Sequence, residues 1–240
     1  MLIDHQKNNE PLFSIVDIKS PKILDILNTT AELGLFDETS KSKIKYESID
    51  YEKESTTYCS TEFFKNVVEP NKQNHGRVNK DLWVDANGDQ LSRPAPIKHK
   101  KNGFADKTPG GQYFIKCFED ITGLDLGDGS QPFAGFRSST YNPDGYLSWH
   151  KDDLYGVFTI MFSYCVDNPN GFYRWVDNRT GEIITLPDKP GWSCKSMIMT
   201  DEEHAEWHTI YTSTPRCSLV LTFGHFEEFL NIKNLIQSDK

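Results

Sequence analysis

The feature that most constrains the fold is a series of short runs rich in β-branched and aromatic residues, which begins near residue 130. Turn-forming sequences such as NPDG, DNPNG, NRTG and KPG separate the runs. About eight such runs at spacings near a dozen residues are typical of a β-sandwich or barrel. The NRTG turn between two of them indicates a hairpin. The sequence therefore predicts a jelly roll, also called a double-stranded β-helix or cupin-like fold.

The preceding 130 residues predict helical additions to this mainly β fold. Ser20 can cap a helix that Pro21 begins and Gly34 ends, because serine favours the N-cap and proline suits the first turn. A strand is expected at 11–18, and helices at 21–33, 61–68 and 111–122. The last helix carries apolar residues at helical spacing that we expect in the core: Tyr113, Phe114, Cys117, Phe118 and Ile121.

We expect the 240 residues to form a single domain. Its parts are an N-terminal α/β section with a loop or lid at 1–130, a jelly-roll core at 131–226 and a C-terminal tail at 227–240. Residues 70–110 are rich in Asn, Lys, Gly and Pro and include the most basic stretch of the chain. The sequence favours a solvated loop there, and the alternative is a flap that meets an anionic substrate.

Charge and composition narrow the class of function. The chain has 26 basic against 35 acidic residues, a formal net charge of −9. This balance disfavours a nucleic-acid partner, since such proteins need cations to neutralise phosphates. No signal peptide and no membrane-spanning run is recognised. The five cysteines are scattered without a CxxC pair, so we expect reduced thiols in a cytoplasmic protein.

The stretch YLSWHKDD at 146–153 raises the question of a metal site. On a strand, residues two apart point to the same side, so His150 and Asp152 would aim an imidazole and a carboxylate at one point. Asp153 would then face away, as a surface carboxylate or a supporting residue. The HxD pair by itself is weak evidence, because it occurs readily by chance. The residues that follow it strengthen the case.

Downstream lie HAEWHTIY and the β-rich run RCSLVLTF. His208 would complete a set of two histidines and one carboxylate, which leaves coordination positions open and suits non-haem Fe(II). Arg216 and Ser218 share one face of their strand. Because a buried arginine is costly unless an anion pairs with it, this pair can clamp a carboxylate.

The ordered set HxD, distal His and Arg-x-Ser resembles the Fe(II)/2-oxoglutarate-dependent oxygenases. The run YNPDGYLSWH is similar to the entry into this motif in prolyl-hydroxylase-like and demethylase-like members. The resemblance covers about residues 132–226. It implies that His150, Asp152 and His208 hold Fe(II), and that Arg216, Ser218 and Tyr141 bind 2-oxoglutarate. O₂ would be the other cosubstrate, and the products would be succinate, CO₂ and a hydroxylated substrate.

Two assignments stay open at this point. His204 could be the distal ligand in place of His208, which we prefer because it stands closer to Arg216. A zinc-peptidase pair of His204 and His208 is disfavoured, since Ala205 stands where the catalytic glutamate would be. Arg137 shares a strand face with Tyr141, so it could bind a substrate carboxylate, or it could pair with one of the chain's many acids.

The favoured function is hydroxylation of an unactivated C–H bond in a small molecule, such as an amino acid or its derivative. One alternative is a hydroxylase of a peptide or protein residue. Another is a metal enzyme that uses the same ligands without 2-oxoglutarate. A third, of a different class, is a non-catalytic jelly-roll binding protein. The sequence indicates a small-molecule partner and no membrane, without fixing an oligomeric state.

Overall fold

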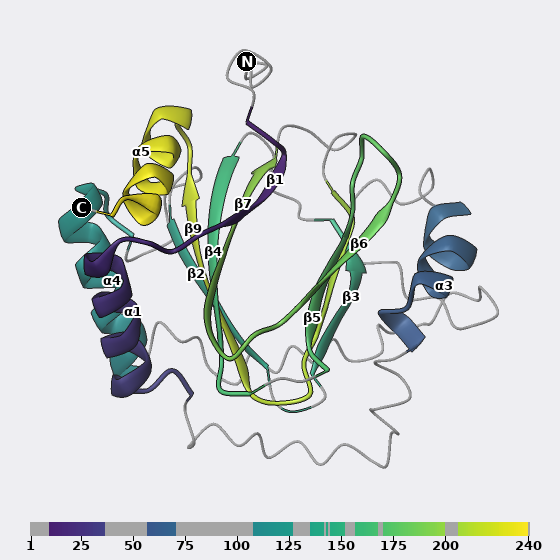
Figure 1. The fold of residues 1–240 in the computed structure, drawn as a ribbon, viewed down its shortest axis with the longest axis horizontal. Helices are drawn as coiled ribbons and strands as arrows, with labels where there is room; N and C mark the ends of the chain where they lie inside the picture. Colours follow the sequence, from purple (N-terminus) through teal and green to yellow (C-terminus); the bar gives the residue numbers. More distant parts are fainter. Residues whose placement is uncertain are drawn as a thin grey trace.

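The computed structural model describes residues 10–36, 57–70, 108–126, 135–141, 143, 145–151, 157–167, 170–199 and 206–239. Within them, two antiparallel sheets face each other (Figure 1). One sheet has the order β1-β7-β4-β9-β2 and the other β3-β8-β5-β6. The strands are β1 Phe13–Val16, β2 Gly135–Tyr141, β3 Tyr146–His150, β4 Val157–Cys165, β5 Phe172–Val176, β6 Ile183–Pro187, β7 Gly191–Met199, β8 His208–Tyr211 and β9 Arg216–Phe223.

From β2 to β9 the chain alternates between the two sheets, except at the hairpin that joins β5 to β6. This winding is that of a double-stranded β-helix, so the predicted fold class is confirmed. The NRTG sequence forms the predicted hairpin turn. Gly181 has φ 72° there, a left-handed conformation that glycine adopts without steric cost.

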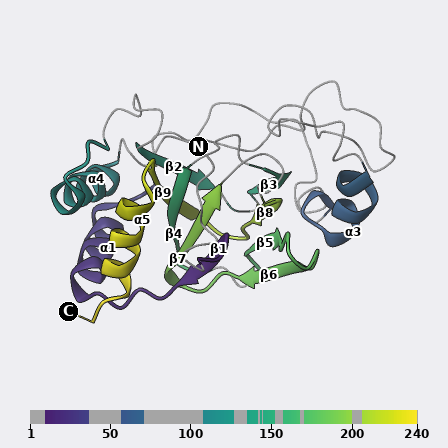
Figure 2. The same ribbon diagram turned by 90° about the horizontal axis from the view of Figure 1, so that it is seen from above.

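The helices are α1 Pro21–Leu33, α3 Thr61–Phe63, the π-helical turn η3 Phe64–Val68, α4 Pro109–Thr122 and α5 Phe226–Gln237. Figures 1 and 2 show α1, α4 and α5 over the outer face of the five-stranded sheet, and α3 beside the four-stranded sheet. Residues 227–240, assigned from sequence to a tail, thus include most of helix α5. The structure contains no helix long and apolar enough to span a membrane among its described residues.

Local sequence explains where the helices begin. α1 starts at Pro21 as predicted, although the side chain of Ser20 makes no capping hydrogen bond. α4 starts at Pro109, two residues before the predicted Gly111, because Thr108 is the N-cap and its Oγ1 accepts a hydrogen bond from the Gly111 N–H at 3.0 Å. Gly110 lets the two helices approach closely, since a Cβ there would lie 2.2 Å from the carbonyl oxygen of Thr30.

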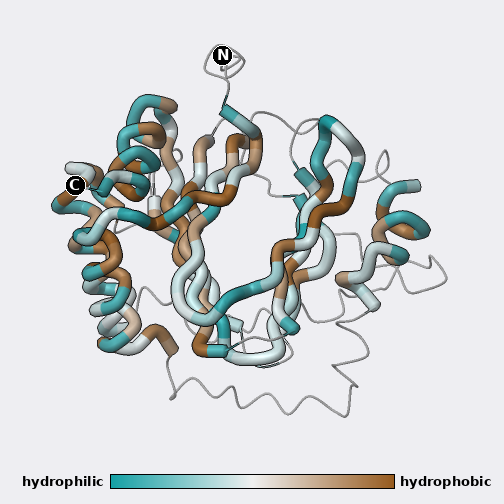
Figure 3. Tube along the Cα trace, in the orientation of Figure 1, coloured by the Kyte–Doolittle hydropathy of each residue, from teal (hydrophilic) through white to brown (hydrophobic). Residues whose placement is uncertain are grey.

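The apolar residues divide into an outer and an inner set. The larger cluster joins α1, α4 and α5 to the outward side chains of β4, β7 and β9. Of the five apolar residues predicted for α4, Phe114 and Phe118 are buried in this cluster, and the other three are partly buried and pack against it. Figure 3 shows that hydrophobic and hydrophilic residues alternate along these helices. A second cluster fills part of the space between the sheets, with Tyr141, Met161, Tyr173, Trp175 and Ile210 at its centre.

Cross-strand register places polar residues on the inner face of the larger sheet. Tyr141 and Cys165 both pair with Arg216, one on either side. In the next row the Cα partners are serines: Ser139, Ser218, Ser163 and Ser193. These rows lie on the inner face because alternation puts them on the same side as Met161 and Val220, which belong to the inner cluster.

Candidate metal and carboxylate site

Two of the predicted metal ligands meet across the smaller sheet. His150 ends β3 and His208 begins β8, and the two residues are Cα partners in the antiparallel register. Their ring centroids lie 4.1 Å apart, and each residue is only 6% exposed. The structure therefore brings the sequence-predicted histidine pair together in a buried position.

Backbone carbonyls orient both imidazole rings. The Nδ1 of His150 lies 2.8 Å from the carbonyl oxygen of Ser148, and the Nδ1 of His208 lies 3.1 Å from that of Glu206. A carbonyl only accepts hydrogen bonds, so each Nδ1 carries the proton and donates. The Nε2 atoms then hold the lone pairs. A hydrogen bond from one ring nitrogen to a backbone carbonyl is the usual support of a metal-binding histidine.

The geometry of this pair fits a shared metal ion. Imidazole nitrogens bind first-row metals at about 2.1 Å, so two rings on neighbouring positions of one ion lie roughly 4–5 Å apart. A third ligand is needed for the predicted set, and Asp152 lies outside the described residues, as does His204. Within the described part of the chain, no three His, Cys, Asp or Glu side chains gather at one point.

Aromatic residues pack near the histidine pair on two sides, next to η3 and inside the barrel. Trp149 and Trp207 are each 2% exposed, and both pack with Phe64 in the cluster beneath η3. The indole N–H of Trp149 donates to the carbonyl of Ser60 at 2.9 Å. On the barrel side, the ring of Tyr173 stacks on His208 with centroids 5.4 Å apart. The stacking of Tyr173 limits the rotation of the His208 imidazole.

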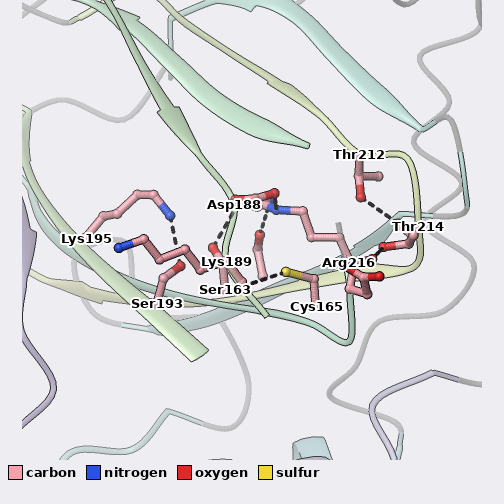
Figure 4. A network of polar contacts seen from close by, with 11 residues as sticks. Ser163, Cys165, Asp188, Lys189, Ser193, Lys195, Thr212, Thr214 and Arg216 are labelled. Carbon is pink, nitrogen blue, oxygen red and sulfur yellow. Dashed lines mark hydrogen bonds and ion pairs between the residues drawn. The ribbon is translucent and has the colours of Figure 1, made fainter. Parts of the chain in front are cut away.

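Arg216 is completely buried and makes three side-chain hydrogen bonds. Its Nε donates to Asp188 Oδ2 at 3.0 Å, Nη1 donates to Ser218 Oγ at 2.9 Å, and Nη2 donates to Ser163 Oγ at 3.1 Å. The carboxylate of Asp188 enters from the connection between β6 and β7, and its side chain is 3% exposed. Figure 4 shows Asp188 between the side chains of Arg216 and Lys195.

Lys195 is a second fully buried cation on the inner face. Its Nζ donates to Ser193 Oγ at 3.3 Å and lies 5.4 Å from the centroid of the Tyr173 ring. Burial, followed by repulsion from Arg216, lowers the pKa of Lys195 from 10.5 to about 8, and attraction to Asp188 acts in the opposite direction. At neutral pH the Lys195 side chain is therefore mostly protonated, and its buried charge lowers the stability of the folded state.

The remaining predicted site residues on β2 take different positions. Tyr141 is 3% exposed, and its ring centroid lies 5.9 Å from Arg216 Cζ. The structure thus brings Tyr141, Arg216 and Ser218 together on the inner face of the larger sheet. Arg137 lies on the same strand face, two rows further along, where it is exposed.

Sequence reasoning missed Asp188, Lys195 and Ser163. Lys195 could have been found, because a lysine at the centre of the strand-like run WSCKSMIMT faces the same side as Ser193 and Met197. A charged residue on the apolar side of a strand indicates a buried partner or ligand. Asp188 lies in the turn sequence PDKPG, and because aspartate is common in turns it does not indicate a functional site there.

Comparison with known proteins gives no sequence match. No family model matches the chain, and no curated protein has a similar sequence. Among solved structures, a Pseudomonas putida prolyl-4-hydroxylase is 10% identical with a TM-score of 0.42, over 91% of this chain and 95% of that one. A Trichoplax adhaerens prolyl hydroxylase, in complex with a hypoxia inducible factor peptide fragment, is 11% identical with a TM-score of 0.39, over 96% and 90%.

The viral collagen prolyl hydroxylase of Paramecium Bursaria Chlorella virus-1, in its 2OG complex, is 11% identical with a TM-score of 0.35, over 90% of this chain and 96% of its own. All three likenesses are low in identity and have TM-scores below 0.5. They therefore assign no role to any residue of this chain.

Proposed function

We propose that the protein is an Fe(II)/2-oxoglutarate-dependent dioxygenase. The observation that carries this proposal is the buried pair of His150 and His208, in which hydrogen bonds at Nδ1 leave the lone pairs on the two Nε2 atoms. A barrel interior with a buried arginine and serine row supports it, since such a surface suits an acidic cosubstrate.

In this proposal His150, His208 and Asp152 hold the metal. Bound Fe(II) supplies the redox chemistry that couples the decarboxylation of 2-oxoglutarate by O₂ to oxidation of a C–H bond. The reaction balances as substrate C–H, 2-oxoglutarate and O₂ giving substrate C–OH, succinate and CO₂. Arg216 and Ser218 supply N–H and O–H donors toward the distal carboxylate, and the ring of Tyr141 lies against the guanidinium.

We propose a small molecule as the substrate, of the size and charge of an amino acid or its derivative. The exposed guanidinium of Arg137 supports a substrate that carries a carboxylate, because it stands on the inner-facing side of an edge strand. A residue in a peptide or protein is the second candidate. The reaction would be the same for a peptide or protein substrate, and only the molecule that enters the site would differ.

The first test uses the purified protein without oxygen. Addition of Fe(II) and 2-oxoglutarate should produce a weak visible charge-transfer band, and admission of O₂ should release succinate. His150→Ala and His208→Ala should each lose the band and the succinate. His225→Ala is the matched control, because His225 is exposed at the start of α5 and its side chain makes no capping hydrogen bond.

The outcomes separate the alternatives. If the wild type gives neither band nor succinate with any pool of amino acids or peptides, the dioxygenase proposal is wrong and a binding role is favoured. If His204→Ala loses iron while His208→Ala retains it, the distal ligand is His204. Succinate that increases only with amino acids, or only with peptides, identifies the substrate class.

A further inference from the structure

We propose that residues 57–68, the segment that contains α3 and η3, hold a β-bulge in β3 and thereby keep the imidazole of His150 inside the barrel. This segment lies beside the smaller sheet in Figure 1. Trp149 is the main positioning residue, because its side chain joins the bulge to the segment. The inference rests on the proposed function where it concerns metal binding, whereas the direction of His150 can be measured without metal.

Strand β3 has one residue more than its partner β8 over the same length. Between the paired positions Leu147 and His150 it has two residues, where β8 has only Thr209. Two residues opposite one form a β-bulge, and bulges beside active sites re-aim side chains. The side chain of Thr209 closes this bulge, since its Oγ1 donates to the carbonyl of Leu147 at 2.6 Å.

The bulge decides which way His150 points. Tyr146 packs on the outer face of the smaller sheet, against the 57–68 segment, and Leu147 packs on the inner cluster. Regular alternation from these two residues would put Trp149 inside the barrel and His150 outside it. In the structure Trp149 instead packs outside with Phe64, and His150 faces the histidine of β8. The extra residue has therefore exchanged the two directions.

Three consecutive carbonyls of the segment accept hydrogen bonds from side chains of the smaller sheet. That of Tyr58 accepts from Ser148 Oγ at 3.2 Å. That of Ser60 accepts from the indole N–H of Trp149 at 2.9 Å. The carbonyl between them accepts from Nη1 of Arg174 on β5. Both bulged residues of β3 are thus bound to the segment, which holds them on the outer face.

The bulge also supplies the acceptor that orients the His150 ring. Nδ1 of His150 donates to the carbonyl of Ser148, the first bulged residue, at 2.8 Å. Release of the bulge would therefore remove both the inward direction of the ring and the hydrogen bond that leaves its lone pair on Nε2. The apparent affinity for a metal ion would then fall with the population of the bulged form.

The test replaces Trp149 by leucine, which lacks the indole N–H and suits the inner face beside Leu147. The regular register should then compete with the bulge, and Co(II) binding measured by calorimetry should weaken about 10-fold or more, the factor for loss of one buried hydrogen bond. Deletion of Ser148 from Trp149→Leu removes the extra residue. Regular alternation then points His150 inward again, so Co(II) affinity should return. A residue that only adds stability would show no such rescue.

Trp192→Leu is the matched control. Trp192 lies on β7 and packs on the outer face of the larger sheet, with its ring centroid 4.9 Å from that of Tyr164. The variant loses the same indole without a change near β3, so it should bind Co(II) as the wild type does. Unchanged Co(II) affinity in Trp149→Leu, or an equal loss in Trp192→Leu, would overturn the inference.

Nitrogen-15 NMR of the imidazoles in metal-free protein separates this inference from the proposed function. The wild type should carry the His150 proton on Nδ1, and Trp149→Leu should lose this signature while that of His208 remains. An unchanged His150 signal in Trp149→Leu would refute the positioning role, even if the wild type binds Co(II) and releases succinate. The expected NMR change without succinate release from any substrate pool would refute the dioxygenase and leave the positioning of His150 in place.

Discussion

Replacement of Lys195 by methionine should stabilise the ligand-free protein. Burial and Arg216 lower the pKa of this lysine from 10.5 to about 8. The difference of 10.5 − 8 = 2.5 corresponds to about 3 kcal/mol that the protonated side chain costs the folded state at pH 7. Methionine removes that cost and loses the weak bond to Ser193, which contributes about 1 kcal/mol. It also suits a site beside Met161 and Met197.

The net gain of about 2 kcal/mol should raise the melting temperature by roughly 4–8 °C for a chain of this size. The sign of the pH dependence follows from linkage. The folded pKa lies below the unfolded one, so the unfolded wild type binds more protons between about pH 8 and 10.5. The stability of the wild type should therefore rise relative to that of the variant through this window, and the variant should have lost its advantage above it.

The assay is urea unfolding of both proteins at about pH 7 and about pH 11, on either side of this window, followed by tryptophan fluorescence. Lys233→Met serves as the comparison, because it breaks the ion pair to Glu10 and should lower stability. A less stable Lys195→Met at neutral pH, or a difference of equal size at both pH values, would show that Lys195 is a structural residue with adequate partners. The reasoning would then be refuted.

Three further predictions concern the scaffold. Gly110→Ala should cost several kcal/mol in unfolding free energy, since its Cβ would meet the Thr30 carbonyl oxygen at 2.2 Å; a wild-type melting temperature would contradict the close helix packing. Thr108→Ala should cost about 1 kcal/mol through loss of the α4 cap, and Thr108→Ser should retain most of it. Burial raises the pKa of Cys194 and Cys217 to about 12, so thiol reagents at mildly alkaline pH should modify both only after unfolding.

The strand series made most of the fold predictable. Alternation and turn chemistry are local signals, and they were sufficient for eight strands from β2 to β9 and for the hairpin at Gly181. Helix α5 was missed because it was assigned to a tail, although Phe229, Ile232 and Ile236 recur at helical spacing on its buried side. The start of α4 was misplaced because the cap at Thr108 was not recognised.

The candidate site was predictable only where its residues lie in regular strands. Arg216 and Ser218 follow simple alternation, and the structure places them side by side on the inner face. β3 has an irregular register between Leu147 and His150, so alternation counted along this strand does not by itself fix the direction of His150. The pairing of Asp188 with Arg216 depends on tertiary packing across 28 positions, which no local pattern encodes.

The edge of the larger sheet has a consequence for the order of assembly. Strand β1 pairs with β7, so that Ile15 lies opposite Lys195, and the backbone N–H groups of Lys19 and Ser20 donate to the carbonyl of Ile236. Contacts so distant along the chain form slowly, because a long loop must close before they contribute. During synthesis β1 is made before its partners, so it cannot dock until β7 and the segment around Ile236 have also been made. Until it docks, the edge of β7 and the lysine it carries stay open to water and to other strands.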